Sequence, residues 1–216
     1  MKTSYTIFRN LITVILLTLP FTLIAQTYGT IGSGSSTATY PLNTYYEDSK
    51  TQMLYTATEL QTAGFSTGLI THLAFDISSF DNKTLNNFKI RLQNTNDTSL
   101  DSFITTNWTT VYDNDYTLTK VGWDTINLNS VFYWDGISNL LIQVCHDNTE
   151  YYEESFVYCS IDSNMVWYEE DDYASGCGFS DGWSDNLKPN ILFGIMPETQ
   201  TDIGIIEFSE PNLNDI

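Results

Sequence analysis

The stretch "NFKIRLQ", from Asn87 to Gln93, has the clearest pattern in the chain and decides the fold class. Its apolar positions are Phe88, Ile90 and Leu92, and its polar positions are Lys89, Arg91 and Gln93. Because successive side chains of a strand point to opposite faces, this alternation predicts a strand with one buried face and one wet face. Such strands are typical of antiparallel sheets.

Three other stretches extend the β pattern on both sides of this strand. "LITHLAFDI", Leu69 to Ile77, alternates and places His72 on the polar, exposed side. "NLLIQVC", Asn139 to Cys145, is apolar on both faces and predicts a central strand. "PNILFGI", Pro189 to Ile195, predicts the last strand. The expected buried side of the first stretch consists of Leu69, Leu73, Phe75 and Ile77.

The segment "FYWDGISNLLIQVC", Phe132 to Cys145, raises the question of whether its Asp-Gly pair is catalytic or structural. Asp135-Gly136 is a strong tight-turn dipeptide, since glycine tolerates positive φ. A catalytic acid or metal ligand at Asp135 is the alternative, and we favour the turn. An earlier turn is expected at Asn129-Ser130.

One short helix is expected in an otherwise β chain. Thr56 and Glu59 have the spacing of a capping box, and Gly64 stands where a helix from Ala57 to Ala63 would end. Strands that recur without intervening helices predict an all-β, two-sheet antiparallel β-sandwich. A jelly-roll-like arrangement of eight strands fits the length better than an immunoglobulin domain of roughly 100 residues.

The two ends of the chain read differently from the middle. Residues 1–25 have the basic start, apolar run and small-residue cleavage point of a secretory signal peptide. A membrane anchor is the alternative, but the apolar run is shorter than the roughly 20 residues that a span needs. Residues 26–197 form the expected sandwich domain. Residues 198–216 read as a linker and the first strand of a missing or truncated following domain.

The charge of the chain argues against nucleic acid and against anionic lipid surfaces as partners. The formal net charge is −19, from 8 basic and 27 acidic residues. Nucleic-acid binding needs Lys and Arg to neutralise phosphates, so no nucleic-acid partner is expected. We expect a protein that is secreted, extracellular or on the outer cell surface, with no membrane insertion after signal removal.

Three cysteines remain for an exported domain: Cys145, Cys159 and Cys177. Export makes a disulfide plausible, and the odd number leaves one thiol over. We expect Cys145–Cys177, with Cys159 as a small apolar strand residue; Cys145–Cys159 is the alternative. Zinc is disfavoured because the only histidines are His72 and His146 and no cysteine pair is closely spaced.

The acidic run from Tyr168 to Asn186 is the best metal candidate. Carboxylates are hard oxygen ligands suited to calcium, but their spacing here matches no EF-hand loop. We favour a solvated acidic loop and no cofactor, with structural calcium as the alternative. The residues that would hold it are Asp171, Asp172, Asp181 and Asp185, with Glu169 and Glu170 beside them.

No catalytic constellation is marked in the sequence. His146 follows Cys145 directly, so the two side chains would point to opposite faces of a strand. The motifs of serine hydrolases and zinc proteases do not occur. A glycosidase-type carboxylate pair is unmarked among the acids, so we expect no catalytic residues.

Aromatic residues in the expected loops give a binding hypothesis. Flat exposed rings can stack on sugar faces while nearby Asp and Asn bond the hydroxyls. The alternative is that most of these rings belong to the core or its rim. The candidates are Tyr151, Tyr152 and Trp183, with the pair Tyr45-Tyr46 beside them.

Several segments in order resemble a known module, among them "TYPLNTYYEDSKTQMLYTATEL", "WTTVYDNDYTLTKVGWDTINL" and "KPNILF". Together with the stretches quoted above, they resemble the N-terminal jelly-roll-like β-sandwich of large secreted surface proteins from gliding, type IX-secreting bacteria. The resemblance covers roughly Thr39 to Phe193. It implies a paired Cys145 and Cys177 and no catalytic residues.

These observations predict a secreted, non-catalytic surface recognition or adhesion module. Its expected partner is an extracellular polysaccharide or a surface glycan or protein. The alternatives are a carbohydrate-binding accessory module of a polysaccharide-degrading enzyme and a glycan hydrolase with an unmarked carboxylate pair.

Overall fold

The computed structural model describes residues 25–173 and 175–198. The expected signal peptide up to residue 24 and the expected strand after residue 198 lie outside the described residues. Within them, no helix is long and apolar enough to cross a membrane.

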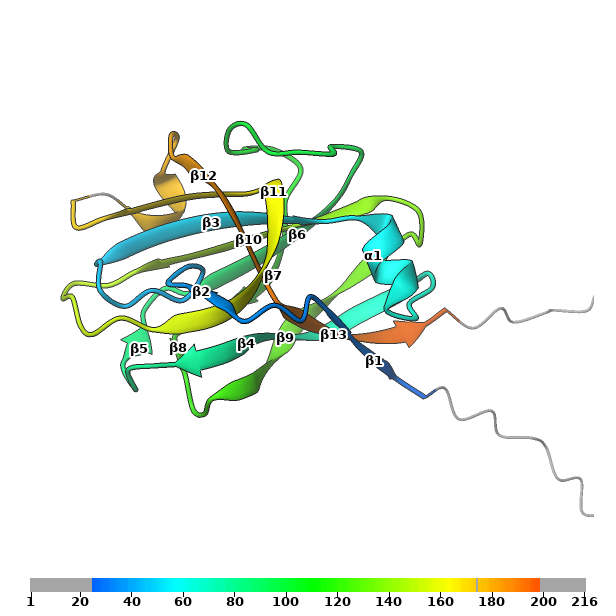
Figure 1. Cartoon of the computed structure of the whole chain (residues 1–216), viewed down its shortest axis with the longest axis horizontal. Coiled ribbons are helices and arrows are strands. Elements are labelled where there is room, and N and C mark those ends of the chain that lie inside the picture. The colour runs from blue at the N-terminus through cyan, green and yellow to red at the C-terminus, as the bar shows by residue number, and fades with distance from the viewer. Residues whose placement is uncertain (1–24, 174, 199–216) are drawn as a thin grey trace, which may run out of the picture.

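Antiparallel β-strands make up most of the described chain, which confirms the predicted all-β, sandwich-like fold with one short helix (Figure 1). The elements are β1 (Thr27–Ile31), β2 (Ser36–Ala38), β3 (Asp48–Tyr55), α1 (Ala57–Thr62), β4 (Gly68–Ser79), β5 (Thr84–Leu85), β6 (Lys89–Thr95), β7 (Thr109–Asp113), β8 (Tyr116–Thr117), β9 (Gly122–Trp134), β10 (Asn139–Asp147), β11 (Phe156–Asp171), a 3-10 turn η1 (Gly176–Gly178), β12 (Trp183–Pro189) and β13 (Ile191–Pro197).

The layers belong to one curled sheet of eleven strands, where eight strands in two sheets were expected. Its hydrogen-bonded order is β1-β13-β4-β11-β3-β10-β6-β7, with β9 on β4 and with β2 and β12 on β11, and β5 and β8 form a separate pair. The long strand β11 joins the layers because Phe156 and Val157 pair with β4, whereas Val166–Asp171 pair with β3. At the other edge β7 lies against β9, so the sheet closes back towards itself.

The core lies between the layers, and the alternation in β6 is confirmed. Phe88, Ile90 and Leu92 are buried, whereas Lys89, Arg91 and Gln93 are half-buried on the other side. The prediction of a central strand is confirmed as well, since β10 is hydrogen-bonded to β3 on one side and to β6 on the other. The last strand is β13, two residues later than expected.

The expected register of β4 is wrong at its start. Ile70, not Leu69, is fully buried with Leu73, while Leu69 is half-buried. The pairings with β9 and β13 both pass over Thr71, so a β-bulge there reverses the alternation. His72 is consequently half-buried, and its Nδ1 lies 2.7 Å from Gln26 Nε2.

The turn at Asp135-Gly136 is confirmed. Gly136 has a φ of +80°, and Asp135 Oδ1 accepts hydrogen bonds from the backbone amides of Ile137 and Ser138 at 3.0 and 2.7 Å. Partial burial acts to raise the pKa of the Asp135 carboxyl, but the hydrogen bond from the Ser138 hydroxyl and these two backbone bonds outweigh it, so the pKa is lowered. The strands on either side do not form a hairpin, because β9 pairs with β4 and β10 pairs with β3 and β6.

The expected chain reversal at Asn129-Ser130 is wrong. Strand β9 runs through this point, and its four residues from Leu128 to Val131 bulge between the pairs Ile70–Phe132 and His72–Asn127. The side chain of Asn129 instead accepts hydrogen bonds from the backbone amide of Asp113 and the side-chain amide of Asn114. The side chain of Asn129 therefore connects this part of β9 to the end of β7.

The helix prediction is confirmed to within one residue. Thr56 Oγ1 accepts from the Glu59 amide and the Glu59 carboxylate accepts from the Thr56 amide, which is the reciprocal capping box. The helix ends at Thr62, and Gly64 has a φ of +92°. Glu59 also pairs at 2.6 Å with the buried Lys188, which ties the helix to β12.

Two loops cover the outer face of the β6-β10-β3-β11 layer, and the core covers its inner face, so every residue of β3 is buried. The loop of residues 96–108 is held by Gln52, whose amide donates to Ile104 O at 2.7 Å and accepts from Ile104 N at 2.8 Å. The loop that contains η1 covers the neighbouring part of the face. A second apolar cluster lies under the first loop and consists of Leu54, Leu100 and Leu141 with Ile104, Trp108, Met165 and Trp167.

Candidate functional site

A disulfide fixes the η1 loop to the sheet. Cys145 on β10 and Cys177 in η1 are bonded, with 5.2 Å between their Cα atoms, which confirms the expected pairing. Cys159 is buried and free, and burial raises the pKa of its thiol to about 12. Gly176 is needed at this contact, since a Cβ there would lie 1.8 Å from His146 O. The loop can therefore lie directly on β10.

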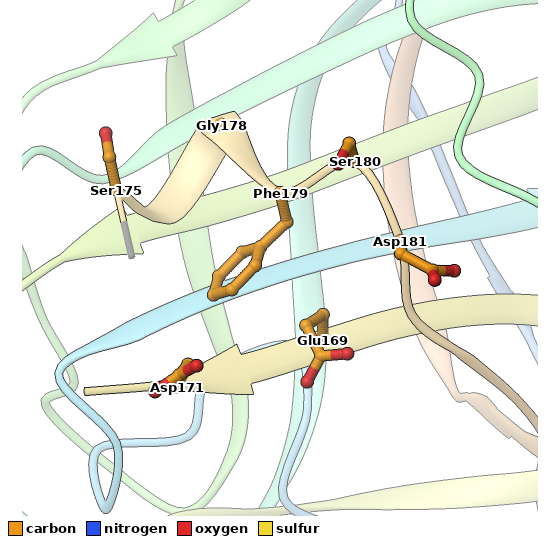
Figure 2. Close-up of a pocket in the computed structure, with 7 residues that line it drawn as sticks. All are labelled: Glu169, Asp171, Ser175, Gly178, Phe179, Ser180 and Asp181. Carbon is orange, nitrogen blue, oxygen red and sulfur yellow. The ribbon is translucent and has the colours of Figure 1, made fainter. Parts of the chain in front are cut away.

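An acidic hollow lies on one side of the η1 loop (Figure 2). Its volume is about 390 Å³. Glu169 and Asp171 of β11 face it from below the ring of Phe179, and Asp181 lies at the far end of the loop. Ser175, Gly178 and Ser180 complete the lining, so hydroxyls and carboxylates surround a single ring.

A basic crevice of about 170 Å³ lies beside the acidic hollow and shares Gly178, Phe179 and Ser180 with it. The sheet contributes three lining residues: Lys50 of β3, Arg91 of β6 and Gln143 of β10. The η1 loop contributes Cys177, Gly178, Phe179 and Ser180, and the loop of residues 96–108 contributes Ile104, Thr105 and Trp108. Lys50 is 4% exposed, donates from Nζ to Phe179 O at 2.6 Å and lies 4.1 Å from the centroid of the Phe103 ring. Burial, and then the charge of Arg91, lower the pKa of Lys50 to about 8.

The four predicted calcium ligands do not converge. Asp171 and Asp181 line the acidic hollow, but Asp172 accepts from the Glu47 amide at 3.2 Å, and Asp185 accepts from the amides of Asn186 and Leu187. No three His, Cys, Asp or Glu side chains gather as a metal site in residues 25–173 and 175–198. Calcium stays a prediction at these residues.

Three tyrosines come together at one end of the sandwich, and we call Tyr45, Tyr46 and Tyr151 the tyrosine cluster. The Tyr45 ring lies 5.3 Å from that of Tyr46 and 6.3 Å from that of Tyr151. Tyr45 is 48% exposed and Tyr151 is 67% exposed.

Hydrogen bonds between backbones hold the two loops that carry the tyrosine cluster. Tyr152 N donates to Thr44 O at 2.8 Å, and Asn148 N donates to Glu47 O at 2.7 Å. The hydroxyl of Thr44 also donates to Glu153 O. The rings are therefore presented by a surface that is already organised without a ligand.

The rings of the other two aromatic candidates, Tyr152 and Trp183, are not part of the ring contacts that define the cluster. Tyr152 is half-buried, with Lys83 Nζ 4.7 Å from its ring centroid. Trp183 is 69% exposed and lies opposite Tyr168 across β11 and β12. Because neighbouring strand residues point to opposite faces, Trp183 does not share a face with Glu169 of the acidic hollow.

The inner face of the sheet ends in a polar row that sequence reasoning missed. His146, Ser49 and Glu170 lie opposite one another on β10, β3 and β11. Within the described part of the chain, Ser49 Oγ and one oxygen of Glu170 lack hydrogen-bond partners, and the His146 ring has the Tyr46 backbone as a polar neighbour. The other Glu170 oxygen accepts from Asn43 Nδ2 at 2.8 Å.

Burial moves the pKa values of this row in opposite directions. It lowers the pKa of His146 to about 4 and raises the pKa of Glu170 to about 7, against the effect of the hydrogen bond from Asn43. The expected separation of His146 from Cys145 is confirmed, because Cys145 lies on the outer face in its disulfide.

The His146→Gln variant is expected to be less sensitive to acid than the wild type. Between pH 6.5 and about 4 the unfolded chain protonates this histidine and the native chain does not, so native stability falls as the pH falls. This lowering of the His146 pKa corresponds to a loss of about 3 kcal/mol in the free energy of unfolding by pH 4. Urea unfolding of both proteins from pH 7 to pH 4 measures the difference.

Glu170→Gln is the matched control for that titration. Burial raises the pKa of Glu170 in the native state to about 7. The protonated carboxyl therefore stabilises the wild type below pH 4.5, and this stabilisation is lost as the pH rises towards 7. The two variants should therefore change the pH profile with opposite signs. Identical pH profiles for wild type and His146→Gln would contradict the buried, neutral state of the histidine.

Sequence reasoning also missed the basic crevice. The stretch "SKTQ", Ser49 to Gln52, is polar at every position, so the sequence gives no sign that Lys50 and Gln52 are buried. They are buried because two distant loops cover that face. The scarcity of basic residues in an acidic chain was the one signal that could have drawn attention to Lys50 and Arg91.

Comparison with known proteins gives no relative for this chain. No protein-family model, no curated protein and no solved structure matches it.

Proposed function

We propose that this protein is a secreted, non-catalytic recognition module that binds an extracellular polysaccharide or surface glycan through the tyrosine cluster. The observation that carries the proposal is the exposure of Tyr45 and Tyr151 in mutual ring contact on two loops that hydrogen bonds hold together. Tyrosine offers a large, flat contact surface at a low cost in side-chain entropy. A surface organised before binding loses little further freedom when the ligand arrives.

The surroundings of the cluster suit hydroxyl-rich ligands. Glu47 lies on the first loop, and Glu150 and Glu153 lie on the second, where Glu150 accepts from the Tyr152 hydroxyl at 3.3 Å. Carboxylates are acceptors for sugar hydroxyls, and the rings supply stacking faces. An accessory module of a polysaccharide-degrading enzyme would use the same surface, so it would share these contacts.

Tyr151→Ala is expected to weaken binding at least tenfold for any polysaccharide that the wild type binds on a glycan array. Exposed aromatic anchors commonly contribute more than about 1.4 kcal/mol, which is a factor of ten in Kd. Titration calorimetry of both proteins with the best glycan measures the change.

Tyr28→Ala is the matched control, because Tyr28 is 55% exposed on β1, away from the cluster, with its ring 6.1 Å from His72. It should leave the affinity unchanged. Equal losses from Tyr28→Ala and Tyr151→Ala, or no binding to any glycan, would refute the proposal.

A further inference from the structure

The basic crevice is unusual in a chain with 27 acidic and 8 basic residues. Two of its three sheet residues, Lys50 and Arg91, are cationic, and no carboxylate lines it. The ion pairs within 25–173 and 175–198 involve Lys89 and Lys188, so neither Lys50 nor Arg91 has an acidic partner there. The two cations are thus placed together without a counter-charge.

The acidic residue paired with Lys50 across the sheet lines the other space. Glu169 lies opposite Lys50 in the β3–β11 register, but it lines the acidic hollow and accepts from the Glu170 amide at 3.0 Å. Phe179 lines both spaces. Among the described residues, Glu169 forms no ion pair with Lys50 or Arg91.

The donors of the crevice are incompletely used. Arg91 Nε is buried and has no hydrogen-bond partner in the described residues. Lys50 makes one hydrogen bond, to Phe179 O, and so retains donor capacity, since an ammonium has three. A buried donor without a partner costs free energy, and a charged acceptor would recover it.

We propose that the crevice binds one compact oxyanion, a carboxylate or sulfate ester carried by the saccharide ligand. This inference rests on the proposed function, and it adds that the ligand is an acidic sugar. The volume of about 170 Å³ corresponds to about five or six water molecules at about 30 Å³ each, which suits one anionic group rather than a sugar chain. A guanidinium fork matches a carboxylate or sulfate with two parallel hydrogen bonds.

The negative charge of the whole chain does not prevent this binding. At physiological ionic strength exposed charges are screened beyond about 8 Å, whereas the crevice donors act at contact distance. The Cys145–Cys177 disulfide holds the η1 loop over the crevice, so its donors stay in place without the ligand. The negative net charge instead repels anions that do not form hydrogen bonds with the crevice donors.

The test compares three oligosaccharides of equal length: uncharged galactose, galacturonate and sulfated galactose. The acidic probes should bind at least tenfold more tightly than the neutral one. Arg91→Gln should remove that advantage, because a hydrogen bond to a charged group accounts for a factor of about ten to a hundred. Lys50→Met, which keeps the side-chain length, should also reduce the preference for the acidic probes. Thermal unfolding checks that both variants fold.

Lys89→Gln is the matched control. Lys89 lies on the same strand and face as Arg91, but it is paired with Asp113 and does not line the crevice. It should leave all three affinities unchanged. Equal affinity of the wild type for charged and neutral probes, or no effect of Arg91→Gln, would overturn the inference.

Two further arms separate this inference from the proposed function. In the first arm, the wild type binds the neutral probe as tightly as the acidic probes, and Tyr151→Ala abolishes this binding. That result would support glycan binding by the tyrosine cluster and reject anion binding by the crevice. An Arg91-dependent response to inorganic sulfate in the absence of saccharide binding would support an anion site and reject the proposed function. Binding of hexaglutamate alone would reject the saccharide as the source of the anion.

Discussion

Phe193→Ala will lower the free energy of unfolding by about 3–5 kcal/mol. Phe193 is fully buried in β13, and its ring makes edge contacts with Tyr55 at 6.0 Å and with Phe65 at 6.2 Å between centroids. Its removal leaves a cavity between the layers that the helix and sheet can fill only in part. Urea denaturation measures the change.

Ile161→Ala is the control for that prediction. Ile161 is 77% exposed on β11, so its truncation should change the unfolding free energy by less than about 0.5 kcal/mol. If both variants lost the same stability, Phe193 would not be at the centre of the packed core.

Loss of the Cys145–Cys177 disulfide will lower the free energy of unfolding by about 3–4 kcal/mol, the chain-entropy value for a loop of this length. The bond joins residues 32 apart and closes the η1 loop over the sheet. The double variant Cys145→Ala/Cys177→Ala, compared with wild type in denaturant without reductant, measures it. The same variant should weaken acidic-sugar binding, because the loop lines the crevice.

Cys159→Ala controls for the loss of a buried sulfur. Cys159 is buried and unpaired, so its replacement should cost only about 1 kcal/mol, near the average for point substitutions. The wild type should show one reactive thiol on unfolding, since it has three cysteines and one disulfide. Three reactive thiols in the unfolded wild type would contradict the pairing.

Local patterns were sufficient for features that depend on neighbouring residues. The alternation of β6, the capping box at Thr56 and the turn at Gly136 all follow from side chains within a few positions of one another. The disulfide was also predicted, although Cys145–Cys159 remained open, because spacing alone does not decide connectivity.

Features that depend on distant partners were missed. The bulge at Thr71 and the continuation of β9 through Asn129 are set by how β4 and β9 pair, which neither stretch reveals alone. The polar start of β3 does not predict that Lys50 is buried, because the loops that cover it come from distant parts of the chain. The candidate binding features arise at these same places, where loops far apart in sequence meet over the sheet.

The most direct test of the proposed recognition surface is NMR of tyrosine-labelled protein during titration with the best glycan from the array. We predict that the ring signals of Tyr45 and Tyr151 shift with a single saturating Kd, while those of Tyr28 and Tyr133, which are 55% and 48% exposed, stay in place. Shifts confined to Tyr28 or Tyr133, with the cluster unchanged at saturation, would contradict the account.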